Sequence, residues 1–514
     1  MDLVNLNLSS PHWSLMLPQL IVFGLSLLLL LGDAFVPKKY HFNGLTALSL
    51  VGYALAMAAL YWQNGKNEYT FNGMFHADGL TVFLSMIILS AAILSVMISA
   101  SYIERLEGRM PIGEFYLLLS FSVLGALLVS AAGDLVMIFV AIELSSLATY
   151  VLTAFAKRRA TSIEGALKYF LLGIFASAIL IYGMAWVYGV TGSTNLDEIS
   201  ARLQTTVSGQ GHLEPALLLG LLLIIVGLGF KIAAVPFHMW TPDAYDGAPT
   251  PVTAFMSVGP KAAGFAALIR IMVQGLGPIQ HDWLNLIAIL AVITMAFGNL
   301  VALAQRNVKR MLAYSSIAHT GYMMVGLAAY QSSKAGFSSG GNATADRGIS
   351  ALLYYLLAYT FVNIGAFAVV TWLQHRGRGM MLDDFAGLAS RRPLAAAAMT
   401  VFMVSLMGVP PLLGFYAKYY VILAAINADK LWLAMAIVLL SAVSAYYYLR
   451  VVAVMYFNPS DKKLINVSTP LLNFGILTMV VANLGIGLFS ERFINLADKW
   501  SGALTVAARI TGKG

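Results

Sequence analysis

Four lysines of this sequence lie inside apolar stretches, where a charged side chain is costly. At the centre of a bilayer a lysine costs at least about 2.5 to 3.5 kcal/mol on insertion scales, so such a residue faces a bundle interior or a wet cavity. A buried amine is suited to proton transfer, because its protonation depends on its surroundings. The four candidates for this chemistry are Lys168, Lys231, Lys261 and Lys418.

One acid lies near the middle of such a stretch. Glu143 is well inside the apolar run 135–155, about 13 Å along a helix at 1.5 Å per residue. It could be a structural partner that neutralises a lysine and fixes helix packing. The functional interpretation uses the same pairing: at an effective dielectric near 20 and ~7 Å, the pair is worth about 2.4 kcal/mol. Moving one charge through 100 mV takes roughly 2.3 kcal/mol, so displacing the acid could eject a proton.

Prolines interrupt two of the apolar stretches close to a lysine. Pro236 follows Lys231, and Pro410 and Pro411 precede Lys418. Proline removes a helix hydrogen bond, and the exposed carbonyls are tolerated at membrane depth only where protein or water satisfies them. We expect both breaks to belong to the site, with a plain kink without function as the alternative.

The composition defines the elements that must position these residues. With 59% hydrophobic residues, 11% charged residues and a mean hydropathy of +0.79, the chain predicts an all-α, polytopic transmembrane bundle. Apolar runs long enough to cross a ~30 Å hydrocarbon layer number roughly 14. Two of them, at 311–327 and 394–426, are numbers ten and twelve in this count.

Basic residues are concentrated in every second loop, and this distribution supports the count of helices. Loops after odd-numbered helices hold 16 Lys and Arg, and loops after even-numbered helices hold 5. By the positive-inside rule the odd loops are cytoplasmic, and both termini lie on the lumen or periplasm side. The net charge of +8 therefore indicates a basic rim near anionic headgroups, not nucleic-acid binding.

The two breaks are five helices apart, so the broken helices seven and twelve cross in opposite senses. This pattern predicts two inverted five-helix repeats, residues 111–275 (helices 4–8) and 276–458 (helices 9–13). Residues 1–110 would form helices 1–3, and residues 459–514 helix 14 and a tail. The residue-level support is modest: the match between SSLA in helix five and SSIA in helix ten could be chance.

No cofactor is expected on this chain. It has no cysteine, which excludes thiolate-ligated iron–sulfur clusters and disulfides, and its eight histidines lack a spacing suited to haem or metal. There is no Walker loop and no dinucleotide fingerprint after a strand. The first apolar run lacks a basic n-region and a cleavage signal, so we expect a retained helix.

One long block gives the chain a family resemblance. The segment KIAAVPFHMWTPDAYDGAPTPVTAFMSVGPKAAGFAALIR closely resembles the central block of the antiporter-like membrane subunits of respiratory complex I and its photosynthetic relatives. The resemblance covers helices four to thirteen. GVPPLLGFYAKYY and MLDDFAGLASRRP look like the N-type member (subunit 2), since the M-type usually has Glu at the Lys418 position. The L-type carries a long lateral helix, for which the tail 491–514 is too short.

The resemblance implies a role for each candidate. Glu143 matches the helix-five glutamate, Lys231 the lysine of the input half-channel and Lys261 the central lysine. The two remaining lysines match a residue near the Glu–Lys pair and the lysine of the output half-channel; they are Lys168 and Lys418. His319, in SSIAHTGYMM, is a relay candidate, although a lone histidine is about as often a hydrogen-bonded core residue.

The family further implies a proton-translocating subunit of a NAD(P)H- or ferredoxin-dependent quinone oxidoreductase. Quinone and iron–sulfur clusters would belong to other subunits, and the partners would be other membrane-arm subunits and lipids. Helix one and its loops look more like the cyanobacterial or plastid version (NDH-1 subunit 2), which implies thylakoid membrane and plastoquinone; a bacterial inner membrane is the alternative. Two other functions stay open: a cation/proton antiporter subunit without redox partners, and a non-pumping assembly scaffold.

Overall fold

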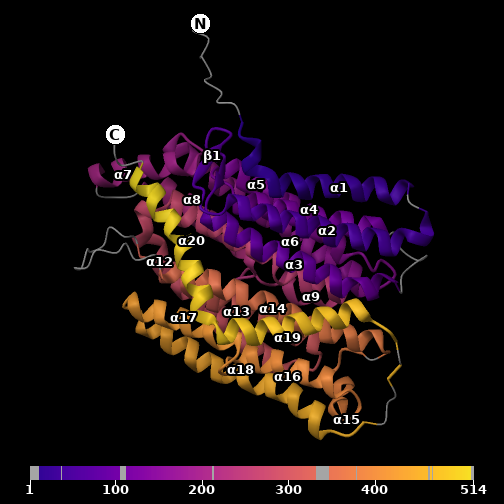
Figure 1. Ribbon diagram of the computed structural model, residues 1–514. Helices are drawn as coiled ribbons and strands as arrows, with labels where there is room; N and C mark the ends of the chain where they lie inside the picture. Colours follow the sequence, from indigo (N-terminus) through magenta and orange to yellow (C-terminus); the bar gives the residue numbers. More distant parts are fainter. Residues whose placement is uncertain are drawn as a thin grey trace.

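The computed structural model describes residues 11–35, 37–104, 112–210, 214–331, 347–377, 379–460, 464–465 and 467–510. Nearly all of these residues are helical, and the long helices run roughly parallel to one another, from left to right in Figure 1. The predicted all-α, polytopic bundle is confirmed.

The N-terminal part contains four long helices and a small β-hairpin. α1 packs on α2 and α4, and α4 packs along α5 (Leu135–Thr153). The strands β1 and β2 are antiparallel, with Tyr69 opposite His76. The elements are η1 (Trp13–Met16), α1 (Leu17–Phe35), α2 (Lys38–Gln63), β1 (Glu68–Thr70), β2 (Phe75–Ala77), α3 (Gly79–Glu104) and α4 (Ile112–Ser130).

The next part holds the first of the predicted breaks. Asp134 caps the first helix here by accepting hydrogen bonds from two backbone N–H groups. The elements are α5 (Leu135–Thr153), α6 (Ala160–Thr191), α7 (Leu196–Gln210), α8 (Pro215–Ile232), α9 (Trp240–Gly247), α10 (Thr250–Met256), α11 (Gly259–Ile269) and the π-helical η2 (Arg270–Gly275).

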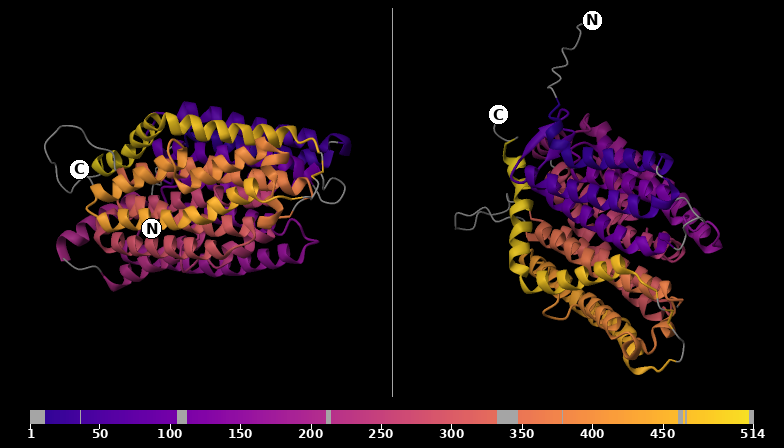
Figure 2. Two further views of the ribbon diagram at one scale, coloured as in Figure 1. Left: turned by 90° about the horizontal axis from the view of Figure 1, so that it is seen from below. Right: turned by 45° about the vertical axis from the view of Figure 1, so that its right-hand side comes forward.

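The C-terminal part contains the second predicted break and ends in a helix that lies across the others. The elements are η3 (Gly277–Ile279), α12 (Gln280–Ala304), α13 (Val308–Ala328), α14 (Arg347–His375), η4 (Leu382–Phe385), α15 (Leu388–Arg391), α16 (Pro393–Met407), α17 (Leu413–Asn427), α18 (Leu431–Phe457), α19 (Pro470–Leu488) and α20 (Ser490–Ile510). The predicted tail is thus largely helix, and Figure 2 shows α20 crossing one end of the bundle.

Twelve helices in the described part of the chain are long and apolar enough to cross a membrane. The count of roughly 14 included two more, and both are helical in the structure. The run 311–327 falls in α13, which has the length but carries polar residues, and the run 394–426 is divided into α16 and α17 of 15 residues each.

The chain breaks where the prolines predict. α8 ends at Ile232, because Ala233 adopts the left-handed conformation (φ +62°), and Pro236 follows in the connection to α9. α16 ends at Met407, because Gly408 adopts the left-handed conformation (φ +93°), and Pro410 lies between α16 and α17. A third break separates α10 from α11 at residues 257–258, which the sequence analysis did not anticipate.

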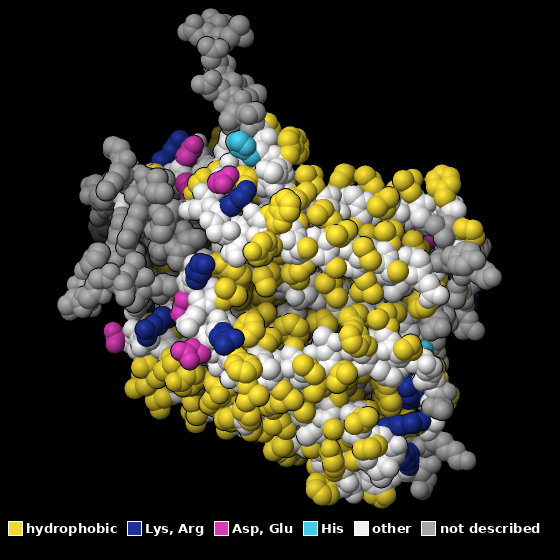
Figure 3. All heavy atoms as spheres, in the orientation of Figure 1, with side chains coloured by type: hydrophobic (Ala, Val, Ile, Leu, Met, Phe, Trp, Pro, Cys, Tyr) yellow, Lys and Arg dark blue, Asp and Glu magenta, His cyan; other side chains and the backbone are white. Residues whose placement is uncertain are grey.

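Burial divides the helices into a core and a periphery. In an 18-residue window of the span 250–275 (α10, α11 and η2) 94% of the residues are buried, against 28% in the corresponding windows of α18 and α19. Exposed apolar side chains cover the visible face of the bundle, while charged side chains gather toward its two ends (Figure 3). This is the distribution expected of a protein surrounded by lipid or by apolar partners.

The two ends of the bundle differ. We call the end with β1, β2 and α7, on the left in Figure 1, the hairpin end; α1 begins there and α20 ends there. We call the opposite end, with α15, the basic end. The compartment that each end faces and the two inverted repeats stay predictions.

Candidate functional site

Lys231 and Glu143 form an ion pair inside the bundle. Lys231 lies in the last turn of α8, Glu143 lies in α5, and Nζ is 2.7 Å from Oε1. The lysine side chain is 5% exposed and the glutamate side chain 20%. The amine also donates to the hydroxyls of Ser146 and Ser177, 3.1 Å from each, and Ser177 donates to the Glu143 carboxylate at 2.6 Å. A buried charge is tolerated when it is paired and hydrogen-bonded in this way.

Local sequence features build this pair. Glu143 and Ser146 share one face of α5 because residues three apart on a helix are neighbours.

α11 approaches α8 closely at Gly264, where a Cβ atom would lie 2.7 Å from the Ile232 side chain. A larger residue at that position would push α11 away from the end of α8, and with it Lys261.

Lys261 is bound by hydroxyls and a carbonyl. It is 2% exposed, and its amine donates to the backbone oxygen of Ser316 at 2.9 Å, to the Ser316 hydroxyl at 2.6 Å and to Thr320 at 3.1 Å. Within the described residues, no carboxylate forms an ion pair with Lys261. Thr320 in turn donates to the carbonyl of Ile232 at 2.9 Å. The residue after Lys231 is therefore linked to Lys261 through one hydroxyl.

His319 directly precedes Thr320 in α13 and is 4% exposed. Its Nδ1 lies 2.8 Å from the hydroxyl of Tyr355, and its Nε2 lies 3.1 Å from that of Tyr448. A small cavity borders His319 and also touches Gly414 and Ala417 at the start of α17. Both ring nitrogens thus contact groups that can donate or accept a proton.

Lys418 lies beside the second break. Its amine donates to the carbonyl of Met407, the last residue of α16, at 2.9 Å, and lies 5.0 Å from the centre of the Tyr322 ring. Gly408 leaves room for this chain, since a Cβ there would lie 3.1 Å from Lys418 Cδ. A carbonyl freed by the helix break thus receives a hydrogen bond from the lysine.

The structure does not bring Lys168 to the Glu143–Lys231 pair. Its side chain is 44% exposed and binds Glu164, one turn earlier on α6, at 2.7 Å and Asp243 of α9 at 2.8 Å. Asp243 also binds Arg310 at 3.0 Å. Burial raises the pKa of Asp243, but Lys168 and Arg310 outweigh burial and hold it below its ordinary value.

Lys168→Met is therefore expected to leave proton translocation within about twofold of wild type, because the amine binds Glu164 and Asp243 and makes no contact with the Glu143–Lys231 pair. The measurement is redox-driven acidification of sealed vesicles by the assembled complex. A loss as large as that caused by replacing Lys231 would return Lys168 to the proton path that the family resemblance implies.

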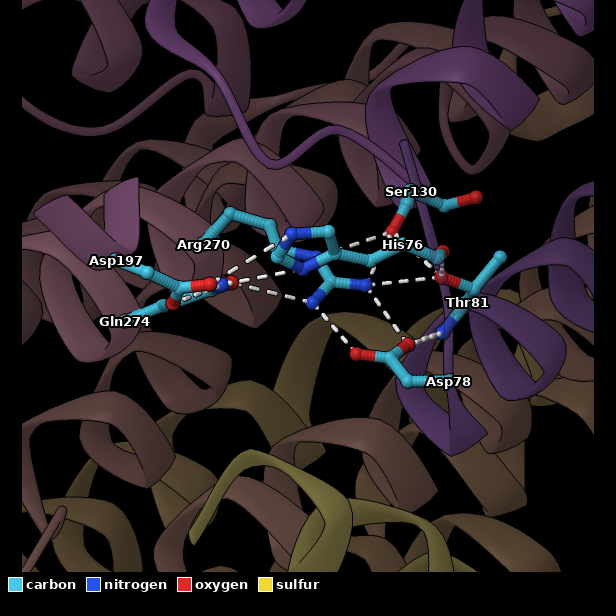
Figure 4. A network of polar contacts seen from close by, with 7 residues as sticks. All are labelled: His76, Asp78, Thr81, Ser130, Asp197, Arg270 and Gln274. Carbon is cyan, nitrogen blue, oxygen red and sulfur yellow. Dashed lines mark hydrogen bonds and ion pairs between the residues drawn. The ribbon is translucent and has the colours of Figure 1, made fainter. Parts of the chain in front are cut away.

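Sequence reasoning missed the residues that bind the lysines. Ser146 and Ser316 are the second serines of SSLA and SSIA, and each binds a buried lysine. The two serines occupy the same position in these two similar motifs, and this match was the sequence signal that could have identified them. Sequence reasoning also found no partner for Arg270, whose side chain is fully buried against Asp78 (Figure 4). Among the described residues no group of three or more His, Asp or Glu side chains could hold a metal ion.

Comparisons with known proteins agree with this architecture. The family model described as NADH:quinone oxidoreductase/Mrp antiporter, TM, matches residues 132–444. The NADH-quinone oxidoreductase subunit N of Trichlorobacter lovleyi is 46% identical over 476 residues, which cover 92% of this chain and 93% of the relative. Subunit N 2 of Rhizobium meliloti is 41% identical over 493 residues, covering 95% and 98%.

Solved structures share the fold. A chain of respiratory complex I from Thermus thermophilus with bound aureothin aligns with a TM-score of 0.75 and 34% identity, covering 93% of this chain and 98% of that one. A chain of the archaeal membrane-bound sulfane sulfur reductase gives 0.80 and 26%, covering 97% and 98%. A chain of the Mrp complex from Dietzia sp. gives 0.79 at 20% identity, covering 96% and 98%, which is a likeness of fold alone.

Proposed function

The chain belongs to the NADH:quinone oxidoreductase/Mrp antiporter membrane family, among the subunits N, and from this premise we propose that it translocates protons in a complex I-type NADH:quinone oxidoreductase. Electron transfer, quinone and iron–sulfur clusters belong to other subunits in this proposal, and the partners are the other membrane-arm subunits. The observation that carries the proposal is the chain of buried lysines from Lys231 through Lys261 toward Lys418.

The Glu143–Lys231 pair is the element that converts a movement into proton release. At an effective dielectric near 20, unit charges attract by about 4 kcal/mol at ~4 Å and by about 2.4 kcal/mol at ~7 Å. The difference of about 1.6 kcal/mol changes proton occupancy more than tenfold. Quinone reduction in another subunit therefore needs to lengthen the distance between the Lys231 amine and the Glu143 carboxylate by only a few ångströms.

Three further residues extend the path from this pair. Thr320 connects the end of α8 to Lys261, His319 adjoins Thr320, and Lys418 lies beside Tyr322, which is three residues after His319 in α13. The break after α8 leads toward the basic end of the bundle, and α17 leads from its break toward the hairpin end. Protons would be taken up at the basic end and released at the hairpin end.

The proposal is tested with the intact complex in sealed vesicles, where quinone reduction is driven and a pH-sensitive dye reports proton movement. Wild type is expected to acidify the compartment that the hairpin end faces. Replacing both Lys231 and Lys261 is expected to remove this signal. An assembled complex that translocates normally without these two lysines would make the chain an assembly scaffold, and sodium-coupled transport without redox activity would make it a cation/proton antiporter.

The electron donor and the membrane are a separate proposal. The relatives reported above are named for NADH and quinone, which favours NADH and a bacterial inner membrane over the thylakoid, plastoquinone and ferredoxin expected for a cyanobacterial or plastid type. We expect the purified complex to reduce quinone with NADH and to show no comparable rate with reduced ferredoxin. Faster reduction with ferredoxin would instead support the cyanobacterial or plastid type.

A further inference from the structure

A groove lies between α19 and α20, where the chain turns from a candidate membrane span into the helix that crosses the bundle (Figure 1). Its volume is about 400 Å³, which is in the range of small-molecule sites. The groove contains no residue of the proposed proton path. It is lined by both helices and by the turn between them, through residues that include Gly485, Ile486, Phe489, Arg492, Phe493 and Leu496.

The groove is apolar and incompletely filled on the side of α19. At Gly485 a Cβ atom would meet nothing within 4 Å outside the backbone of its own helix. Gly485 is four residues after Val481, and residues four apart share one face of a helix. On that face Phe474 and Val481 are 61% and 59% exposed. A hydrocarbon chain that lies in the groove therefore stays on apolar side chains where it continues along α19.

One cation lies at this groove. Arg492 is exposed in the first turn of α20, and its guanidinium carbon lies 5.6 Å from the centre of the Phe489 ring. Within the described part of the chain Arg492 makes no ion pair, and its neighbour Glu491 is not among the residues that line the groove. A guanidinium binds a phosphate group through two parallel, charge-assisted hydrogen bonds. The groove thus offers an anion site next to an apolar one.

The position of α20 brings this cation to the depth of lipid headgroups. The span of α19 ends at Leu488, so α20 begins at the boundary of the hydrocarbon layer. Asn495 and Lys499 of α20 are exposed, whereas Ala497 and Trp500 are buried, and the helix packs on α3 and α14. A helix with one apolar and one polar face is typical of the interface between membrane and water. A molecule with an anionic head and an apolar tail matches both helices.

We propose that the groove between α19 and α20 binds one phospholipid, with an acyl chain against Gly485 and Ile486 and the phosphate on Arg492. The proposal does not depend on proton translocation, since it uses none of the residues of the proposed path. A phospholipid is favoured over an extended segment of another subunit, because Arg492 carries the only hydrogen-bonding side chain among the described lining residues. The backbone N–H and C=O groups of such a segment would find no partners in the apolar part of the groove.

The test uses the intact complex in vesicles of phosphatidylethanolamine and phosphatidylglycerol, with a trace of phosphatidylglycerol that carries a photoreactive diazirine on one acyl chain. After illumination, mass spectrometry of the peptides locates the label. In wild type, labelling per residue is expected to be several-fold higher in 482–496 than in 474–481, the exposed surface that bulk lipid covers. Equal labelling would make the groove ordinary lipid-exposed surface, and no label in 482–496 would mean that another subunit covers it; either result overturns the proposal.

Two substitutions remove the two halves of the site separately. Gly485→Leu fills the groove and leaves the cation, whereas Arg492→Gln removes the cation and leaves the space. In the assembled complex each is expected to lower labelling of 482–496 several-fold without changing that of 474–481, and Arg492→Lys should retain most of the label. Lys499→Gln is the matched control, because it removes an exposed cation of α20 outside the groove and should label as wild type does. Unchanged labelling in both Gly485→Leu and Arg492→Gln, or an equal loss in Lys499→Gln, rejects the site.

Discussion

Replacing Lys231 by methionine is expected to abolish redox-driven proton translocation and to slow coupled quinone reduction by at least about tenfold, since a positioned proton-transfer group typically contributes more than that. The amine is 2.7 Å from the Glu143 carboxylate and bound by two serines, and methionine has no group that could carry a proton there. The measurement is dye-reported acidification of sealed vesicles, together with the rate of quinone reduction, after assembly has been verified.

Lys231→Arg is the matched control, because it separates pairing from proton exchange. An arginine keeps the positive charge and can bind Glu143, but it does not release its proton. We therefore expect the Lys231→Arg complex to assemble as wild type does and still not translocate protons. Normal translocation by this variant would show that the pair only holds α5 and α8 together.

Lys231→Met also leaves Glu143 without its cation inside the bundle, and breaking a buried pair in this way typically costs about 3 to 5 kcal/mol. The double variant Lys231→Met with Glu143→Gln removes that penalty. It should recover assembly without recovering translocation, which distinguishes a lost proton carrier from a lost structural contact.

The main positions of the site could be predicted because they violate the rules for a membrane segment. A lysine in an apolar run and a proline in a helix each carry a cost, so Lys231, Lys418, Pro236 and Pro410 stood out from their surroundings. The structure places each lysine at the end of, or beside, a broken helix. Pro411 lies in the same connection between α16 and α17.

The hydroxyl ligands could not be predicted in the same way. Serine and threonine are common in membrane helices, where they bond to the preceding turn, so their presence signals nothing by itself. Ser316 and Thr320 acquire their role only because α13 passes Lys261, 55 and 59 residues away in sequence. Arg270 and Asp78 are separated by 192 residues, and the sequence around either residue does not indicate that the other is its partner.

Lys168 shows the limit of carrying a role over by motif. The sequence motif around it matches the family, yet its amine faces Asp243 and Glu164 at the edge of the bundle. A helix of 32 residues such as α6 presents several faces at several depths, so a position on the helix does not determine which neighbour a long side chain reaches.

α13 is the element on which the proposed path converges. Ser316 and Thr320 bind Lys261, His319 lies on the same helix, and Tyr322 faces Lys418. Thr320 further binds the last residue of α8. A movement of α13 relative to α8 or α17 would therefore alter the surroundings of Lys261 and Lys418 at the same time.

Lys261→Met is expected to abolish proton translocation while the complex still assembles. The substitution leaves only hydroxyls and one carbonyl without their hydrogen-bond partner. Each unsatisfied polar group of this kind lowers stability by about 1 to 3 kcal/mol, which is less than the effect of an unpaired buried charge. Translocation should be lost because Lys261 is the basic group that the Thr320 hydroxyl joins to the end of α8, beside Lys231. The measurement is proton uptake per electron transferred in sealed vesicles.

Thr320 supplies the control pair for this prediction. Thr320→Ser keeps the hydroxyl that joins the Ile232 carbonyl to Lys261 and should translocate as wild type does, whereas Thr320→Val keeps the shape and removes the hydroxyl. We expect Thr320→Val to lower translocation about tenfold, as the loss of one hydrogen bond to a charged group, roughly 1.5 kcal/mol, implies. Equal rates in the two variants would separate Lys231 from Lys261 and require another connection between them.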